Sequence, residues 1–95
     1  MTVLRHYTMT AVEGRADDLR VALQGLAAKV GALPQSLKVE LFSDPDAPGT
    51  FVFIEHWASV ADHKQAGAML GKEAFAPVAV TLAAPPLGRY LIAVE

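Results

Sequence analysis

The sequence predicts an α+β domain of the ferredoxin-like class, with the order strand, helix, strand, strand, helix, strand and a four-stranded antiparallel sheet. Three observations support this fold. Alternating apolar and polar residues indicate strands, apolar residues spaced three and four apart indicate a helix, and clusters of Pro, Gly and Asp separate these segments. Ninety-five residues fit one domain, so residues 1–95 are expected to fold as a single unit.

The first half of the chain has the clearest periodicities. Residues 2–12 alternate and suit a strand, whereas residues 14–31 suit an amphipathic helix that ends at Gly31, because Pro34 prevents its continuation. One face of the strand carries Val3, Arg5, Tyr7 and Met9. The apolar stripe of the helix consists of Leu19, Ala22, Leu23, Leu26 and Val30.

The second half begins with a predicted hairpin, in which residues 36–42 and 50–57 are joined by the turn-rich residues 43–49. Ser59 and Asp62 then resemble a capping box that opens a helix, and Gly71 interrupts this helix. A shorter helix over about residues 72–82 is expected to be bent or started by Pro77. Pro85, Pro86 and Gly88 end it, and residues 89–94 form the last strand.

The strand over residues 50–57 is apolar on both faces, although two helices can cover only one face of a sheet. Hydrophobic residues make up 53% of the chain and charged residues 19%, which is an apolar composition for a small monomer. Both observations favour a homodimer in which a second sheet covers the open face.

Composition also excludes several classes of protein. The net charge of -2, with scattered Lys and Arg, argues against binding of nucleic acid. The chain has no cysteine, and therefore no disulfide or thiolate chemistry. The first residues lack the apolar run of a signal peptide, and no segment is long and apolar enough to cross a membrane, so we expect a soluble, cytoplasmic protein.

Residues 53–59 read Phe-Ile-Glu-His-Trp-Ala-Ser, and they are preceded by Gly14 at the start of the first helix and by Leu33-Pro34 before the second strand. With these features the whole chain resembles the antibiotic-biosynthesis-monooxygenase family of dimeric α/β barrels. That family includes quinol monooxygenases that act without a cofactor and relatives that degrade heme. The resemblance implies a homodimer that binds a small aromatic substrate and O2 and needs no cofactor.

Departures from the family pattern narrow this expectation. Many members have a histidine where this chain has Ala66, and heme-degrading members have an asparagine at Tyr7, a tryptophan at Ala66 and a heme-ligating histidine near Ala76. Heme binding is therefore disfavoured. Some aromatic-polyketide monooxygenases carry a tyrosine at the position of His63, which supports a proton-handling group there.

Strand and helix periodicities place the candidate residues on shared faces, and the resemblance implies that these faces look toward a pocket under the helices. His63 is the expected base, because its ordinary pKa of about 6.5 lies near neutrality. Tyr7 and Glu55 are the other expected catalytic groups, and the Tyr7 hydroxyl is expected to donate a hydrogen bond to a substrate carbonyl. The expected substrate-binding residues are Trp57, Phe53, Arg5, Val60 and Leu70.

Each of these residues also has a structural interpretation. Glu55 could pair with Arg5 or with backbone N–H groups, Trp57 could only pack in the core, and His63 could lie half-exposed on the helix. The hydroxyl of Tyr7 could bond to a neighbouring strand. His6 and His56 lie on the opposite strand face from His63, so we expect no metal site.

The leading hypothesis is a cofactor-independent monooxygenase that oxidises a quinol or polycyclic phenol with O2. A non-catalytic module that binds a small molecule is the alternative from a different class. A third possibility is a cofactor-free isomerase-like enzyme acting on a small hydroxy ketone, in which His63 and Glu55 would transfer protons.

Overall fold

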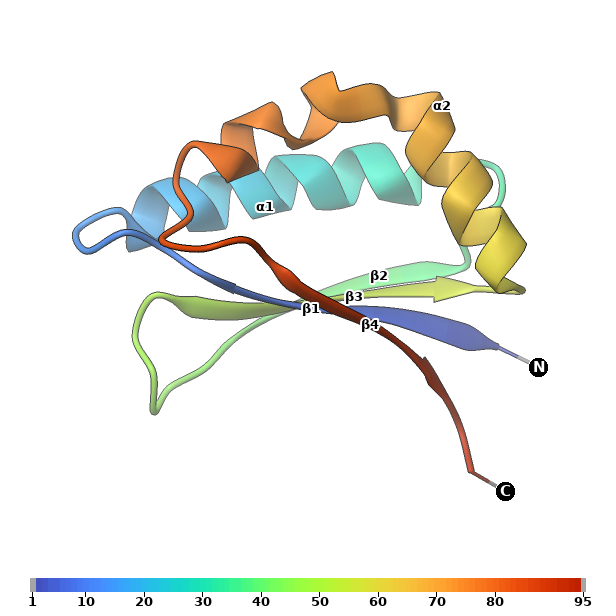
Figure 1. Cartoon of the computed structure of the whole chain (residues 1–95), viewed down its shortest axis with the longest axis horizontal. Coiled ribbons are helices and arrows are strands. Elements are labelled where there is room, and N and C mark those ends of the chain that lie inside the picture. Colours follow the sequence, from blue (N-terminus) through green and yellow to red (C-terminus); the bar gives the residue numbers. More distant parts are fainter. Residues whose placement is uncertain (1, 95) are drawn as a thin grey trace.

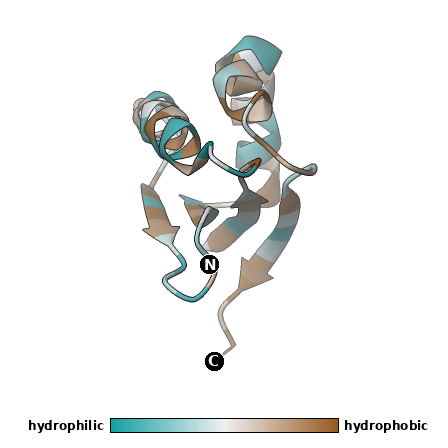
Figure 2. Ribbon diagram, turned by 90° about the vertical axis from the view of Figure 1, so that its left-hand side faces the viewer, coloured by the Kyte–Doolittle hydropathy of each residue, from teal (hydrophilic) through white to brown (hydrophobic). Residues whose placement is uncertain are grey.

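A computed structural model describes residues 2–94 and has the predicted order of elements (Figure 1). Both helices lie on the same side of a four-stranded sheet (Figures 1 and 2). The ferredoxin-like α+β fold is thereby confirmed. The elements are β1 (Val3–Thr10), α1 (Ala16–Gly31), β2 (Lys38–Ser43), β3 (Thr50–Trp57), α2 (Val60–Ala79) and β4 (Leu87–Ile92).

The strands are arranged in the order β2-β3-β1-β4, and every neighbouring pair is antiparallel. β1 and β3 are therefore the central strands. Their register places Arg5 opposite Glu55 and Tyr7 opposite Phe53, while on its other side Tyr7 lies opposite Gly88 of β4. Side chains that share a register row point to the same face of the sheet, so these rows decide which residues meet.

The core lies between the sheet and the two helices. Burial alternates strictly along β3, where each second residue from Phe51 to Trp57 is buried. The α1 helix contributes the buried residues of its predicted apolar stripe, because positions three and four apart share one side of a helix. The main buried side chains are Met9, Leu19, Leu23, Val30, Phe51, Phe53, Trp57 and Val78.

The α2 helix starts and bends where the sequence predicts. The Asp62 backbone N–H donates to Ser59 Oγ over 3.1 Å, which caps the first turn. Gly71 has φ 72° and ψ 174°, a backbone conformation that residues with a side chain rarely adopt, and it separates two helical halves. Pro77 lies within the second half.

The last strand begins at Leu87, two residues earlier than the sequence predicts. Gly88 looks like a turn residue because it follows two prolines, but it pairs with Tyr7 in the β1–β4 ladder. The position of this strand is set by pairing with a distant segment and not by local composition.

The face of the sheet opposite the helices is largely apolar. It carries Leu4, Thr8 and His6 from β1 and their register partners Val52 and Ile54 from β3. The outer strands add Phe42, Leu87 and Leu91, which are 48%, 67% and 39% exposed. We call this surface the open face. Within residues 2–94, no helix has the length and apolar character needed to cross a membrane.

Candidate functional site

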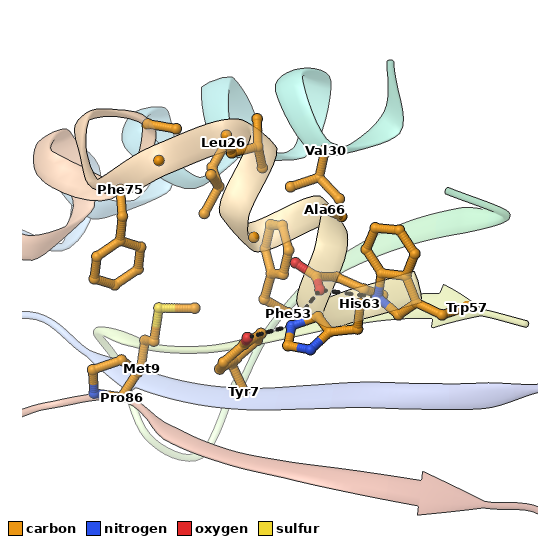
Figure 3. A pocket seen from close by; sticks show the side chains of 15 residues that line it. Tyr7, Met9, Leu26, Val30, Phe53, Trp57, His63, Ala66, Phe75 and Pro86 are labelled. Atoms are coloured by element: carbon orange, nitrogen blue, oxygen red, sulfur yellow. Dashed lines mark hydrogen bonds and ion pairs between the residues drawn. The ribbon is translucent and has the colours of Figure 1, made fainter. Parts of the chain in front are cut away.

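A cavity of about 320 Å³ lies between the sheet and the helices (Figure 3). This volume is within the range of small-molecule binding sites. Most of its lining is apolar, and its polar groups are Tyr7, Glu55, Trp57 and His63. The lining consists of Tyr7, Met9, Leu26, Val30, Phe53, Glu55, Trp57, His63, Ala66, Gly67, Leu70, Gly71, Ala74, Phe75 and Pro86.

Strand alternation brings the floor of the cavity together. Tyr7 and Met9 are alternate residues of β1, and Phe53, Glu55 and Trp57 are alternate residues of β3. All five therefore face the helices. Tyr7 and Phe53 are direct register partners, and their rings meet edge to face with centroids 6.5 Å apart.

The first half of α2 supplies the opposite wall. Ala66, Gly67 and Leu70 follow His63 by three, four and seven positions, so all four share one side of the helix. The kink at Gly71 then redirects the chain, so that Phe75 lies at the end of the cavity near Met9 and Pro86 (Figure 3). The cavity thus has a polar end around His63 and an apolar end around Phe75.

The His63 ring connects three strands. Its Nε2 lies 3.1 Å from the Tyr7 hydroxyl and 3.6 Å from Glu55 Oε1, whereas its Nδ1 lies 2.7 Å from the Tyr90 hydroxyl. The same Glu55 oxygen accepts a hydrogen bond of 3.1 Å from the indole N–H of Trp57. These contacts form one polar cluster around the imidazole, which Figure 3 shows between Tyr7 and Trp57.

Burial disfavours charge throughout this cluster. It raises the pKa of Glu55, although the hydrogen bond from Trp57 and the positive charge of Arg5 oppose this rise. Burial also lowers the pKa of His63, and the positive charges of Arg5 and Lys64 lower it further. The pKa of Tyr7 is raised by burial, against the opposing effect of Arg5. The imidazole is therefore neutral at neutral pH, which is the form that can accept a proton.

The sequence profile described as "Antibiotic biosynthesis monooxygenase" matches residues 2–69, which is more than half of the chain. The chain belongs to this family. The match includes β1, β3 and the first half of α2, which supply most of the cavity. The resemblance seen in residues 53–59 is thus confirmed.

Solved structures of similar fold agree with this assignment. A protein of Caulobacter crescentus CB15, assigned as an antibiotic biosynthesis monooxygenase, is 29% identical with a TM-score of 0.84, over 99% of this chain and 91% of that one. PA3566 from Pseudomonas aeruginosa is 22% identical with a TM-score of 0.82, over 99% and 95%. SnoaB from Streptomyces nogalater, a cofactor-independent oxygenase, is 13% identical with a TM-score of 0.81, over 99% and 94%. A search of curated proteins finds no match.

Arg5 and Val60 were expected among the substrate-binding residues, but neither lines the cavity. Arg5 points to the covered face as predicted, but its guanidinium lies over the rings of Tyr7 and Tyr90, with its carbon 5.0 and 4.3 Å from their centroids. Glu55 is hydrogen-bonded to Trp57 instead of Arg5. Val60 is the first residue of α2, one turn before His63, and does not reach the cavity.

The structure also adds residues that the sequence interpretation missed. Tyr90 was assigned to the last strand without a role, although it lies opposite Arg5 in the β1–β4 register and on the same face. Phe75 follows the kink at Gly71, where helix periodicity no longer predicts which side faces inward. Among residues 2–94, no group of three or more His, Asp or Glu is arranged to hold a metal ion.

Proposed function

We propose that this protein is a monooxygenase that oxidises a quinol or polycyclic phenol with O2 and without a bound cofactor. One observation carries the proposal: a cavity-lining histidine stands with Tyr7 and Glu55 at one end of an otherwise apolar cavity. A flat phenol fits such a cavity with its hydroxyl at the polar end and its rings against apolar side chains.

The proposed reaction begins at Nε2 of His63, which accepts the proton of the substrate hydroxyl. The resulting phenolate is electron-rich and reduces O2. One oxygen atom becomes bonded to a ring carbon, the substrate loses two hydrogen atoms overall and becomes a quinone, and the other oxygen atom leaves as water. The substrate itself supplies all the electrons, so the balance requires no further reductant.

The neighbours of His63 have complementary roles in this proposal. The Tyr7 hydroxyl, 3.1 Å from Nε2, donates a hydrogen bond to the substrate oxygen as negative charge develops on it. The Glu55 carboxyl group, 3.6 Å from Nε2, faces the imidazolium that forms. Trp57 holds Glu55 in place through its indole N–H, and Phe53 and Leu70 contact the rings of the substrate.

A second copy of the chain completes the proposed enzyme by covering the open face. The apolar side chains of that face, including Phe42, Leu87 and Leu91, are exposed in the single chain. Burial of apolar surface contributes roughly 25 cal/mol per Å², which favours pairing of two such faces. The homodimer would leave the cavity free, because the cavity is lined by the helices and by the side of the sheet that they cover.

Oxygen consumption with a panel of hydroquinones, hydroxynaphthalenes and anthrones tests the activity. His63→Ala should lower the rate on any active substrate at least about 100-fold, the usual contribution of a general base. His56→Ala is the matched control, because His56 lies on the open face and is bonded to Glu40. An equal rate for wild type and His63→Ala would remove His63 from the reaction.

A binding module is the second candidate, and one observation favours it. The polar groups around the cavity already bond to one another, with both ring nitrogens of His63 facing tyrosine hydroxyls. Such a site could hold an apolar metabolite without reacting with it. Tight binding of a quinone, with no oxygen uptake by any quinol of the panel, would support the binding module against the enzyme.

A further inference from the structure

Tyr90 contacts His63 from the side away from the cavity. The Tyr90 hydroxyl lies 2.7 Å from Nδ1, and the two rings meet edge to face with centroids 5.3 Å apart at 80°. His63 lines the cavity and Tyr90 does not. The two nitrogens therefore have different surroundings: Nε2 faces Tyr7 and Glu55 of the cavity lining, whereas Nδ1 faces β4.

A neutral imidazole carries one ring proton, and its position decides what His63 can do. With the proton on Nε2, the lone pair lies on Nδ1 and no base faces the cavity. With the proton on Nδ1, the lone pair lies on Nε2, beside the substrate position. The Tyr90 hydroxyl can accept from Nδ1–H while its own hydrogen points elsewhere, so it can stabilise the second form.

We propose that Tyr90 is a positioning residue, whose hydroxyl accepts a hydrogen bond from Nδ1–H of His63 and so keeps the Nε2 lone pair in the cavity. This inference rests on the proposed function, because it assigns His63 the base role. Tyr90 lies outside the segment that matches the family, which ends at residue 69.

Three features hold Tyr90 in this position. Its backbone pairs with Arg5 in the β1–β4 ladder, and the Arg5 guanidinium lies over its ring. The third feature is Gly88, which lies opposite Tyr7. A Cβ atom at Gly88 would lie 2.7 Å from Arg5 Nη2 and 3.0 Å from the Tyr7 ring, so glycine lets both side chains take these positions without shifting.

The groups around His63 compete for the position of its proton. Arg5 and Tyr7 on β1, Glu55 on β3, Tyr90 on β4 and Lys64 on α2 are the charged or titratable neighbours. The Glu55 oxygen beside Nε2 attracts the proton to that nitrogen, whereas Tyr90 attracts it to Nδ1. Removal of the Tyr90 hydroxyl should therefore move the proton to Nε2.

Two-bond ¹H–¹⁵N correlation spectra of histidine-labelled protein distinguish the two tautomers of His63 directly. The wild type should show protonation at Nδ1. Tyr90→Phe, which keeps the ring over Arg5, should show protonation at Nε2. His56→Ala is the control, because His56 lies on the opposite face of the sheet, where it is hydrogen-bonded to Glu40, and its removal should leave Nδ1 of His63 protonated. Protonation of Nε2 in the wild type, or an unchanged tautomer in Tyr90→Phe, would overturn the proposal.

Kinetics supply a second readout if a substrate is found. Tyr90→Phe should lower kcat at least about tenfold with KM nearly unchanged, because it changes the state of the base and no contact with the substrate. Equal kcat values for wild type and Tyr90→Phe would contradict the inference. If no quinol is oxidised, the proposed function fails, while the tautomer measurement still decides the role of Tyr90. Urea denaturation of each variant shows that it is folded before its spectra are compared.

Discussion

The two faces of the sheet are built from alternate residues of the same strands, yet they differ in burial and in the groups that they carry. On β3, Phe53, Glu55 and Trp57 are buried under the helices and line the cavity, whereas Val52 and Ile54 are half-buried on the open face. One face therefore holds the cavity proposed to bind a small molecule, and the other holds an exposed apolar surface proposed to bind a second copy of the chain. A period of two is enough to give one strand two separate tasks.

Two glutamates, one on each face, have pKa values that are shifted in opposite directions. Glu55 is only 6% exposed, and burial raises its pKa. Glu40 lies on the open face, where its Oε1 is 2.6 Å from Nε2 of His56, and this hydrogen bond lowers its pKa. The same carboxyl group thus shifts in opposite directions on neighbouring strands, because one environment excludes water and the other supplies a donor.

The largest expected effect is a difference in the free energy of unfolding between substitutions of a packed side chain on each face. Phe53→Ala should lower the free energy of unfolding by about 3–5 kcal/mol, since Phe53 is fully buried and its loss would enlarge the cavity that it lines. Val52→Ala, one residue away on the open face, should cost less than about 1.5 kcal/mol in dilute protein. Urea denaturation followed by tryptophan fluorescence measures both. Equal costs would show that the open face is packed as tightly as the core.

The sequence predicted which residues face the helices, because a strand with one buried face must alternate its apolar residues with a period of two. Alternation in β1 and β3 and the stripe of α1 were sufficient for the fold and for most of the core. The start of β4 was misplaced, since Gly88 belongs to a strand only through its pairing with Tyr7. Pairing between distant segments leaves no local signal in composition.

The sequence predicted part of the candidate site. The structure brings Tyr7, Glu55, Trp57 and His63 together, as the strand and helix periods indicated. Arg5 does not line the cavity, because its long side chain extends over the rings of Tyr7 and Tyr90. This position depends on β4, which supplies Tyr90. Tyr90 was missed for the same reason: its contact with His63 requires both the register of β4 and the position of α2.

The second prediction tests the open face as an interface. Ile54→Lys places a charge at the centre of that face and should weaken self-association at least about 100-fold, equivalent to about 2.8 kcal/mol. Sedimentation equilibrium over a range of concentrations measures the change. Met69→Lys is the matched control, because Met69 is an exposed apolar residue of α2 and lies away from the sheet. If Met69→Lys dissociates the protein and Ile54→Lys does not, the helices form the interface.

The third and smallest effect concerns the two glutamates. A raised pKa in the folded state means that folded Glu55 keeps its proton at pH values where the unfolded chain has lost it. Its contribution to stability is therefore present at low pH and is lost as the pH rises from the usual pKa of glutamate to that of Glu55. Glu55→Gln keeps an oxygen that can accept from Trp57 but cannot ionise, so this loss should disappear, and the variant should gain stability relative to the wild type as the pH rises.

Glu40→Gln should do the opposite, which makes it the matched control. Because the pKa of Glu40 is lowered, its contribution is present above the usual pKa of glutamate and is lost as the pH falls, so the variant should be weaker than the wild type mainly at neutral pH. Urea denaturation between about pH 4 and pH 8 compares the three proteins. His63 adds a slope below its usual pKa, where stability falls with falling pH. Glu55→Gln changes this slope, because Glu55 lies 3.6 Å from the imidazole, so the signs of the differences are compared above the usual pKa of histidine. Differences of the same sign for Glu55→Gln and Glu40→Gln would mean that burial at Glu55 and the hydrogen bond from His56 at Glu40 do not shift the two carboxyl groups in opposite directions.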